Sequence, residues 1–89
     1  MEIFKSASAG TLESSDVYVE IEPATDILSI SVESVVEKQF GEKIRSAVNE
    51  VLSDHGVSAA SVRIIDRGAL ECVIRARVET AILRTKEDK

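Results

Sequence analysis

The spacing of apolar residues changes part-way along the chain, and this change limits the folds that are open to it. In "VYVEIE", residues 17–22, Val17, Val19 and Ile21 alternate with other residues, as in a strand with one buried face. Residues 27–33 alternate in the same way. Further on, apolar residues recur at spacings of three and four, which is typical of an amphipathic helix. A chain with both patterns is expected to combine a sheet with helices.

The first helix is predicted over residues 34–55. Ser34 and Glu37 have the spacing of a capping box, in which each side chain accepts a hydrogen bond from the other residue's backbone N–H. Gly56 can adopt the left-handed conformation that ends a helix. His55 is expected to be a solvent-facing cation near the C-terminal end of the helix dipole. The expected apolar stripe of this helix consists of Val36, Phe40, Ile44, Ala47, Val48, Val51 and Leu52.

The second half of the chain adds a strand and a segment that fits two patterns. Residues 61–66, "SVRIID", alternate like a third strand and end in a turn at Asp66 to Gly68. Residues 69–84 fit a helix, but part of the segment also alternates like a strand. Its length favours the helix. The helical pattern would bury Leu70, Val73, Ile74, Val78, Ala81 and Ile82.

The order of elements predicts an α+β two-layer sandwich, with the helices at 34–55 and 69–84 on one face of a small, mostly antiparallel sheet. The strands at 17–22 and 27–33 are expected to form an antiparallel hairpin across "PATD". The early segment "IFKSAS" is a candidate edge strand. At 89 residues the chain is expected to be a single domain, 1–89, too small for a deep catalytic cleft.

Composition excludes several classes of function. A net charge of −5 disfavours nucleic-acid binding, which depends on clustered Lys and Arg. No apolar run approaches the roughly 20 residues of a membrane helix, and the N-terminus lacks the pattern of a secretory leader, so a cytoplasmic protein without membrane contact is expected. The single Cys72 cannot form an internal disulfide and is expected to be a small core residue.

Candidates for catalysis are few. One His and one Cys, without a CxxC pair, do not make a conventional zinc site, so no metal is expected. The four glycines are too far apart to form a phosphate-binding loop. Ser14, Asp16 and His55 can be combined on paper into a triad, but three such residues occur by chance in most domains. No catalytic residue is therefore assigned.

The polar corner "LESSD", residues 12–16, is the remaining candidate site. Serine and Asp side chains bond to nearby backbone N–H groups, so the corner is a turn ahead of the strand that begins at Val17. Such a turn holds a serine hydroxyl outward, where a modifying enzyme can reach it. Without an adjacent His, the serine is better suited as an attachment point than as a nucleophile. The loop at residues 11–16 is expected to be exposed and mobile.

Three blocks of sequence resemble the citrate lyase acyl carrier proteins, the gamma subunits of that complex. These blocks are "GTLESSD", "VVEKQFGEKIR" and "RGALECVIRARVE", and the resemblance extends from Gly10 to about Ala81. It implies that Ser14 carries 2'-(5''-phosphoribosyl)-3'-dephospho-CoA through a phosphodiester, which makes the chain a phosphoprotein. Ser15 stands where the family often has Gly, so it is the alternative attachment site, and it replaces a residue that adopts positive φ freely.

The resemblance also implies a non-catalytic role in citrate fermentation. The thiol of the arm would hold acetyl and citryl thioesters while citrate is cleaved to acetate and oxaloacetate. The implied partners are the alpha (transferase) and beta (lyase) subunits, a prosthetic-group transferase and an acetylating ligase. The alternatives left open are the acyl carrier of malonate decarboxylase, an unmodified assembly module and a stand-alone hydrolase that uses Ser14.

Overall fold

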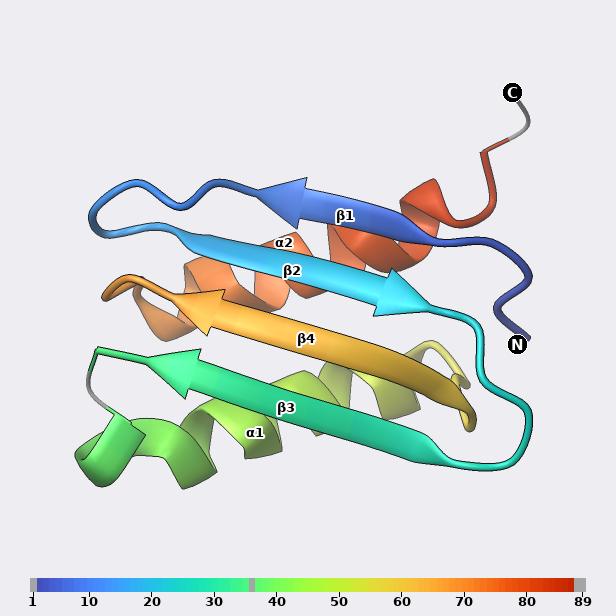
Figure 1. Ribbon diagram of the computed structural model, residues 1–89, viewed down its shortest axis with the longest axis horizontal. Coiled ribbons are helices and arrows are strands. Elements are labelled where there is room, and N and C mark those ends of the chain that lie inside the picture. Colours follow the sequence, from blue (N-terminus) through green and yellow to red (C-terminus); the bar gives the residue numbers. More distant parts are fainter. Residues whose placement is uncertain (1, 36, 88–89) are drawn as a thin grey trace.

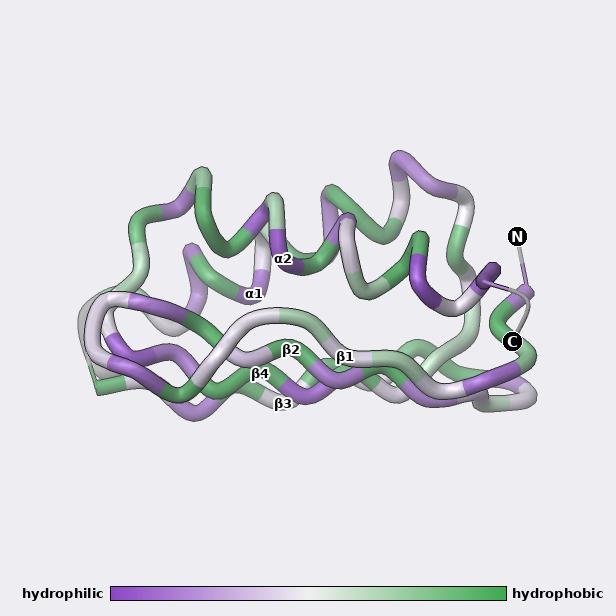
Figure 2. Tube along the Cα trace, turned by 90° about the horizontal axis from the view of Figure 1, so that it is seen from above, coloured by the Kyte–Doolittle hydropathy of each residue, from purple (hydrophilic) through white to green (hydrophobic). Residues whose placement is uncertain are grey.

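The protein folds as a sheet with two helices packed on one of its faces (Figure 1). The computed structural model describes residues 2–35 and 37–87, without the side chains of residues 37–39. Its elements are β1 (Ala7–Gly10), β2 (Val17–Glu22), β3 (Leu28–Ser34), α1 (Glu37–Asp54), β4 (Ala60–Asp66) and α2 (Glu71–Arg84). Seen along the sheet, helices and strands form two separate layers (Figure 2). The α+β fold with two layers is therefore confirmed, and the ambiguous C-terminal segment is a helix.

The four strands lie in the order β1-β2-β4-β3. The β1–β2 and β2–β4 pairs are antiparallel, and the β3–β4 pair is parallel. The predicted hairpin between residues 17–22 and 27–33 is therefore wrong, because β4 lies between these two strands. The chain passes from β3 through α1 to β4, and a crossover of this kind makes neighbouring strands parallel. The candidate edge strand exists as β1, but it begins at Ala7 and pairs with β2.

An aliphatic core fills the space between the two layers. In β2, Val17, Val19 and Ile21 are fully buried, and they face the equally buried Ile64 and Val62 of β4 across the register. On the helical side, α1 packs over β3 and contacts α2, while α2 packs over β1 and β2. The buried helical residues are Ile44, Ala47, Val48, Val51, Leu52, Ile74, Val78, Ala81 and Ile82.

The two ends of α1 differ in how far the described residues test the predicted caps. Ser34 is the last residue of β3, and its hydroxyl donates to the Asp66 carboxylate at 2.8 Å, so the capping box with Glu37 stays a prediction. The Glu37 side chain, the other half of the predicted capping box, and Val36 lie outside the described residues. At the other end, Gly56 adopts φ 70°, and Val57 N–H donates to Leu52 C=O at 2.9 Å, the pattern of a glycine-terminated helix.

Three predicted core residues are exposed. Phe40 in the first turns of α1 is 43% exposed, and Leu70, just before α2, is 71% exposed. Cys72 is also exposed. It precedes the buried Ile74 by two residues, which places it about 200° away around the helix. Phe40 and Leu70 lie at the same end of the helical layer, and that end is where the candidate site is found.

Candidate functional site

Two loops meet at one end of the sheet and are joined by backbone hydrogen bonds. Residues 11–16 connect β1 to β2, and residues 67–70 connect β4 to α2 (Figure 1). Ser15 N–H donates to Arg67 C=O at 2.9 Å, and Arg67 N–H donates to Asp16 C=O at 2.9 Å. These bonds extend the β2–β4 ladder beyond the strands, so the polar corner is attached to its neighbour in the sheet.

Ser14 lies at the tip of a tight turn. Asp16 N–H donates to Glu13 C=O at 3.1 Å and closes the turn, with Ser14 and Ser15 as its central residues. Ser15 has φ 66° whereas Ser14 does not have a positive φ, which is the arrangement of a type II turn. Both serines are exposed, and the Ser14 hydroxyl has no hydrogen bond to residues 2–35 or 37–87. Ser15 therefore takes the backbone conformation for which Gly is ordinarily chosen, and Ser14 presents a free hydroxyl.

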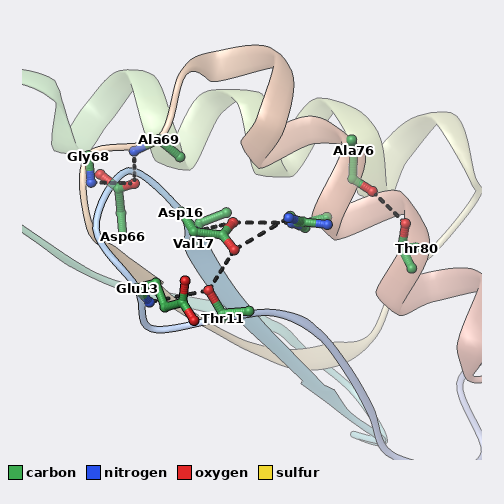
Figure 3. Close-up of polar contacts among 10 residues, drawn as sticks. Thr11, Glu13, Asp16, Val17, Asp66, Gly68, Ala69, Ala76 and Thr80 are labelled. Atoms are coloured by element: carbon green, nitrogen blue, oxygen red, sulfur yellow. Dashed lines mark hydrogen bonds and ion pairs between the residues drawn. The ribbon is translucent and has the colours of Figure 1, made fainter.

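The carboxylate of Asp16 is the centre of the hydrogen bonds that shape this turn (Figure 3). Thr11 Oγ1 donates to Oδ2 at 2.7 Å, and Val17 N–H donates to Oδ1 at 2.7 Å. From α2, Arg77 reaches both oxygens, with its Nε 3.2 Å from Oδ1 and its Nη2 3.3 Å from Oδ2. Thr11 Oγ1 also accepts from Glu13 N–H at 3.2 Å. One side chain thus ties both ends of the loop to α2.

These donors keep Asp16 ionised. The hydrogen bond from Thr11, followed by that from Val17 N–H and the contribution of Arg77, lowers the pKa of Asp16 from 3.8 to about 2. The guanidinium of Arg77 partly balances the negative charge of this carboxylate. An anionic group attached at Ser14 would therefore meet less repulsion than the local sequence "ESSD" suggests.

Asp66 fixes the second loop. Its side chain is 2% exposed, and its Oδ1 accepts from Gly68 N–H at 3.2 Å and from Ala69 N–H at 2.9 Å (Figure 3). Its Oδ2 accepts from Ser34, so the same residue also holds the end of β3. The sequence predicted a turn here, but it did not predict that the turn supports the residues beside Ser14. The signal was an Asp followed two residues later by Gly, which is typical of an Asx turn.

Gly10 allows the β1–β2 loop to begin where it does. It has φ 90°, and a Cβ atom at this position would overlap with the carbonyl oxygen of Val17. The backbones of β1 and β2 approach each other here more closely than a side chain permits. No role was predicted for Gly10, although a glycine directly before a polar corner was a signal for such an approach.

Comparison with known proteins shows which family this chain belongs to. A family model described as malonate decarboxylase delta subunit (MdcD), an acyl carrier family, matches residues 4–85. The citrate lyase acyl carrier protein of Haemophilus influenzae (strain PittEE) is 52% identical over 88 residues, covering 99% of this chain and 92% of the relative. That of Streptococcus uberis is 48% identical over 84 residues, covering 94% of this chain and 83% of the relative. The chain belongs to the citrate lyase acyl carrier protein family.

A solved structure agrees with this assignment. A chain in the crystal structure of a Pseudomonas malonate decarboxylase hetero-tetramer in complex with malonate superposes with a TM-score of 0.80 at 25% identity. The match covers 96% of this carrier and 88% of that chain. The resemblance drawn from the three sequence blocks is thus confirmed, and the protein is a non-catalytic carrier.

The structure does not assemble the triad that could be written from the carrier's sequence. Asp16 bonds to Thr11 and Arg77, whereas His55 follows the opposite end of α1, with its Nε2 3.2 Å from Glu79 Oε2. The His55 side chain is only 24% exposed, so it is less solvent-facing than expected. Within the described ranges, no group of His, Cys, Asp and Glu is arranged to hold a metal ion, and neither helix is long and apolar enough to cross a membrane.

Proposed function

We propose that this carrier serves citrate lyase and holds 2'-(5''-phosphoribosyl)-3'-dephospho-CoA on Ser14 through a phosphodiester. The observation that carries the proposal is the exposed Ser14 hydroxyl at the tip of the Glu13–Asp16 turn, which makes no hydrogen bond to the described residues. Ser15 is less suited, because its N–H is bonded to Arg67 and its backbone is held at φ 66°.

The residues around Ser14 fit an anionic attachment. Its phosphodiester would form when the hydroxyl oxygen attacks the phosphorus of an activated donor, the bond from that phosphorus to a leaving pyrophosphate or phosphate breaks, and the hydroxyl proton passes to a base of the attaching enzyme. Arg77 offsets the charge of Asp16, and Thr11 to Ser15 are open to solvent, which screens the remaining repulsion from Glu13. When bound, the group supplies a thiol that holds an acyl thioester. The protein's own part is to hold the turn that presents it.

The partners follow from this role. The alpha and beta subunits of citrate lyase would receive the thioester in turn, after a prosthetic-group transferase attaches the arm and a ligase acetylates its thiol. A tethered thioester reaches each active site at an effective concentration on the order of millimolar. The net charge of −5 suits basic entrances on the partners. Residues 1–89 act as one carrier domain, and we place the complex in the cytoplasm.

Intact mass and peptide mapping of the protein from its native host test the attachment site. We expect an adduct on the peptide that contains Ser14, lost completely in Ser14→Ala. Ser15→Ala is the matched control, because it removes a neighbouring exposed hydroxyl and should keep the adduct. An adduct that persists in Ser14→Ala would show that the arm is attached to another residue. An adduct that is lost only in Ser15→Ala would assign the attachment to Ser15. A native protein without any adduct would overturn the proposal in favour of an unmodified assembly module.

The carrier of malonate decarboxylase is the second candidate, because the fold matches a chain of that complex. The identity to citrate lyase carriers, 52% against 25%, favours citrate. The purified native complex decides between them. A complex acetylated on its carrier should release oxaloacetate from citrate, whereas release of carbon dioxide from malonate would support the second candidate.

A further inference from the structure

A hollow of about 340 Å³ opens between the first turns of the two helices, beside the β4–α2 loop. Its inner wall includes Ile44 and Ile74, which are buried members of the core. Its rim includes Phe40 and Leu70, two of the three exposed residues that the sequence predicted to be buried. Two large apolar side chains are thus left open to solvent around one concave site.

The hollow lies next to the turn that carries Ser14. Ser15 N–H donates to Arg67 C=O at 2.9 Å, and the next residue, Gly68, lines the hollow. Asp66, which fixes this loop through Gly68 and Ala69 N–H, also lies on its wall. A group attached to Ser14 therefore begins at the loop that forms one side of the hollow.

One cation on the wall, Lys43, can meet an anionic group near Phe40. Lys43 places its ammonium 5.9 Å from the centroid of the Phe40 ring, and no carboxylate of a described residue forms an ion pair with it. The two acids of the wall are already engaged. Asp66 accepts hydrogen bonds from Ser34 and the loop, and Glu71 is paired with Arg75 at 2.9 Å. Lys43 is the cation left to meet a ligand.

We propose that the hollow binds the adenosine and diphosphate part of the carrier's own prosthetic arm, with the adenine against Phe40 and Leu70 and the diphosphate facing Lys43. This inference rests on the proposed function. In the arm named above, the phosphoribosyl group joins Ser14 directly to the adenosine, so the nucleotide is the part nearest the protein. Aromatic side chains bind bases by stacking, and lysine binds phosphate as a point charge.

Such binding would divide the arm into a held part and a free part. The nucleotide would rest against the protein, and the thiol-bearing end beyond the diphosphate would extend from a fixed point. A shorter free tether confines the thioester to a smaller volume and raises its effective concentration at a docked partner. The hollow would thus act on the reach of the arm and leave its chemistry unchanged.

NMR spectra of the apo and holo forms of the full chain test this inference. We expect shift differences at Phe40 and at the methyl groups of Ile44 and Ile74, with cross-peaks between adenine protons and the Phe40 ring. Phe40→Ala should lower the docking equilibrium constant about 5- to 150-fold, the range for loss of one base stack. Phe4→Ala is the matched control, because Phe4 is 81% exposed and is not among the residues that line the hollow.

Intact mass measured on the same samples distinguishes failure of the docking inference from failure of the proposed attachment at Ser14. An adduct without shift differences at the hollow overturns the docking inference and leaves the proposed function intact. No adduct overturns both. Shifts at the hollow that appear equally in apo and holo protein, and only when partner subunits are added, would assign the hollow to a partner protein. Loss of docking in both Phe40→Ala and Phe4→Ala would show that the effect is not local.

Discussion

The two ends of the sheet are built differently. At the end that carries Ser14, two side-chain carboxylates accept backbone hydrogen bonds: Asp16 from the first N–H of β2, and Asp66 from two N–H groups of the β4–α2 loop. At the other end, backbone groups bond to one another, as in Ala60 N–H to Ile27 C=O at 3.1 Å. The first end is thus shaped by side chains that single substitutions can remove.

This difference shows how an exposed turn can be ordered without being buried. Thr11 to Ser15 are exposed, so apolar packing contributes little to their placement. Asp16, Asp66 and the close approach at Gly10 supply the constraint instead, and none of them is the serine itself. Ser14 can therefore be modified without disturbing the contacts that hold its turn. The sequence predicts that the loop at residues 11–16 is mobile, and its amide protons should therefore exchange faster than those of the sheet.

The largest expected effect comes from Gly10→Ala. The new Cβ would overlap with the Val17 carbonyl oxygen, and φ 90° adds backbone strain, so we expect a loss of about 3 kcal/mol or more in the free energy of unfolding. Gly68→Ala is the matched control, because Gly68 has φ 95° but no atom within 4 Å of the added Cβ. It should cost only about 1–2 kcal/mol. Equal losses in urea denaturation would contradict the close approach between β1 and β2.

The second effect is a pH dependence caused by Asp16. Its pKa in the folded state, about 2, lies below its ordinary value of 3.8, so it stabilises the fold above about pH 4 and loses this contribution as the pH falls toward 2. The stability difference between wild type and Asp16→Asn should therefore shrink between pH 5 and pH 2. Thr11→Val should raise the pKa of Asp16, because the Thr11 hydroxyl is the first cause of its shift.

Urea denaturation across this pH range measures the first part, and carboxyl carbon NMR of Asp16 measures the second. Asp26→Asn is the control, because it removes the same charge from an exposed loop at the other end of the sheet. If the difference for Asp16→Asn stays constant down to pH 2, the carboxylate does not hold the loop in the way that its contacts indicate.

Individual strands and helices were easier to predict from the sequence than the order of the strands in the sheet. The strand at residues 17–22 was predicted with its observed bounds, because strict alternation and the following Pro23 both act locally. The hairpin was wrong because strand order depends on contacts distant in sequence. One signal in the sequence pointed to the true order: residues 27–33 and 61–66 flank a helix, as in a βαβ unit.

The position of the candidate site in the chain was predicted, but the contacts that shape it were not. Ser14 and its polar corner were recognised from type and order, and the exposed turn was found there. Gly10 and Asp66 had only local signals for a turn, and the role of Arg77 had none, because it depends on Asp16, which the fold brings close to α2. Phe40 and Leu70 were misassigned because helical periodicity does not indicate where the opposing sheet ends.

The smallest expected effect concerns the left-handed conformation of Ser15. Ser15→Gly should be about 0.5–1 kcal/mol more stable than Ser15→Ala, because both lack the hydroxyl but only Gly adopts φ 66° without steric cost. Ser14→Gly serves as the reverse control. Ser14 does not have a positive φ, so glycine there should be less stable than Ser14→Ala by about 0.5 kcal/mol. Urea denaturation of the four variants gives both comparisons. If glycine has the same sign of effect at both positions, the turn is not the type II turn that presents Ser14 at its tip.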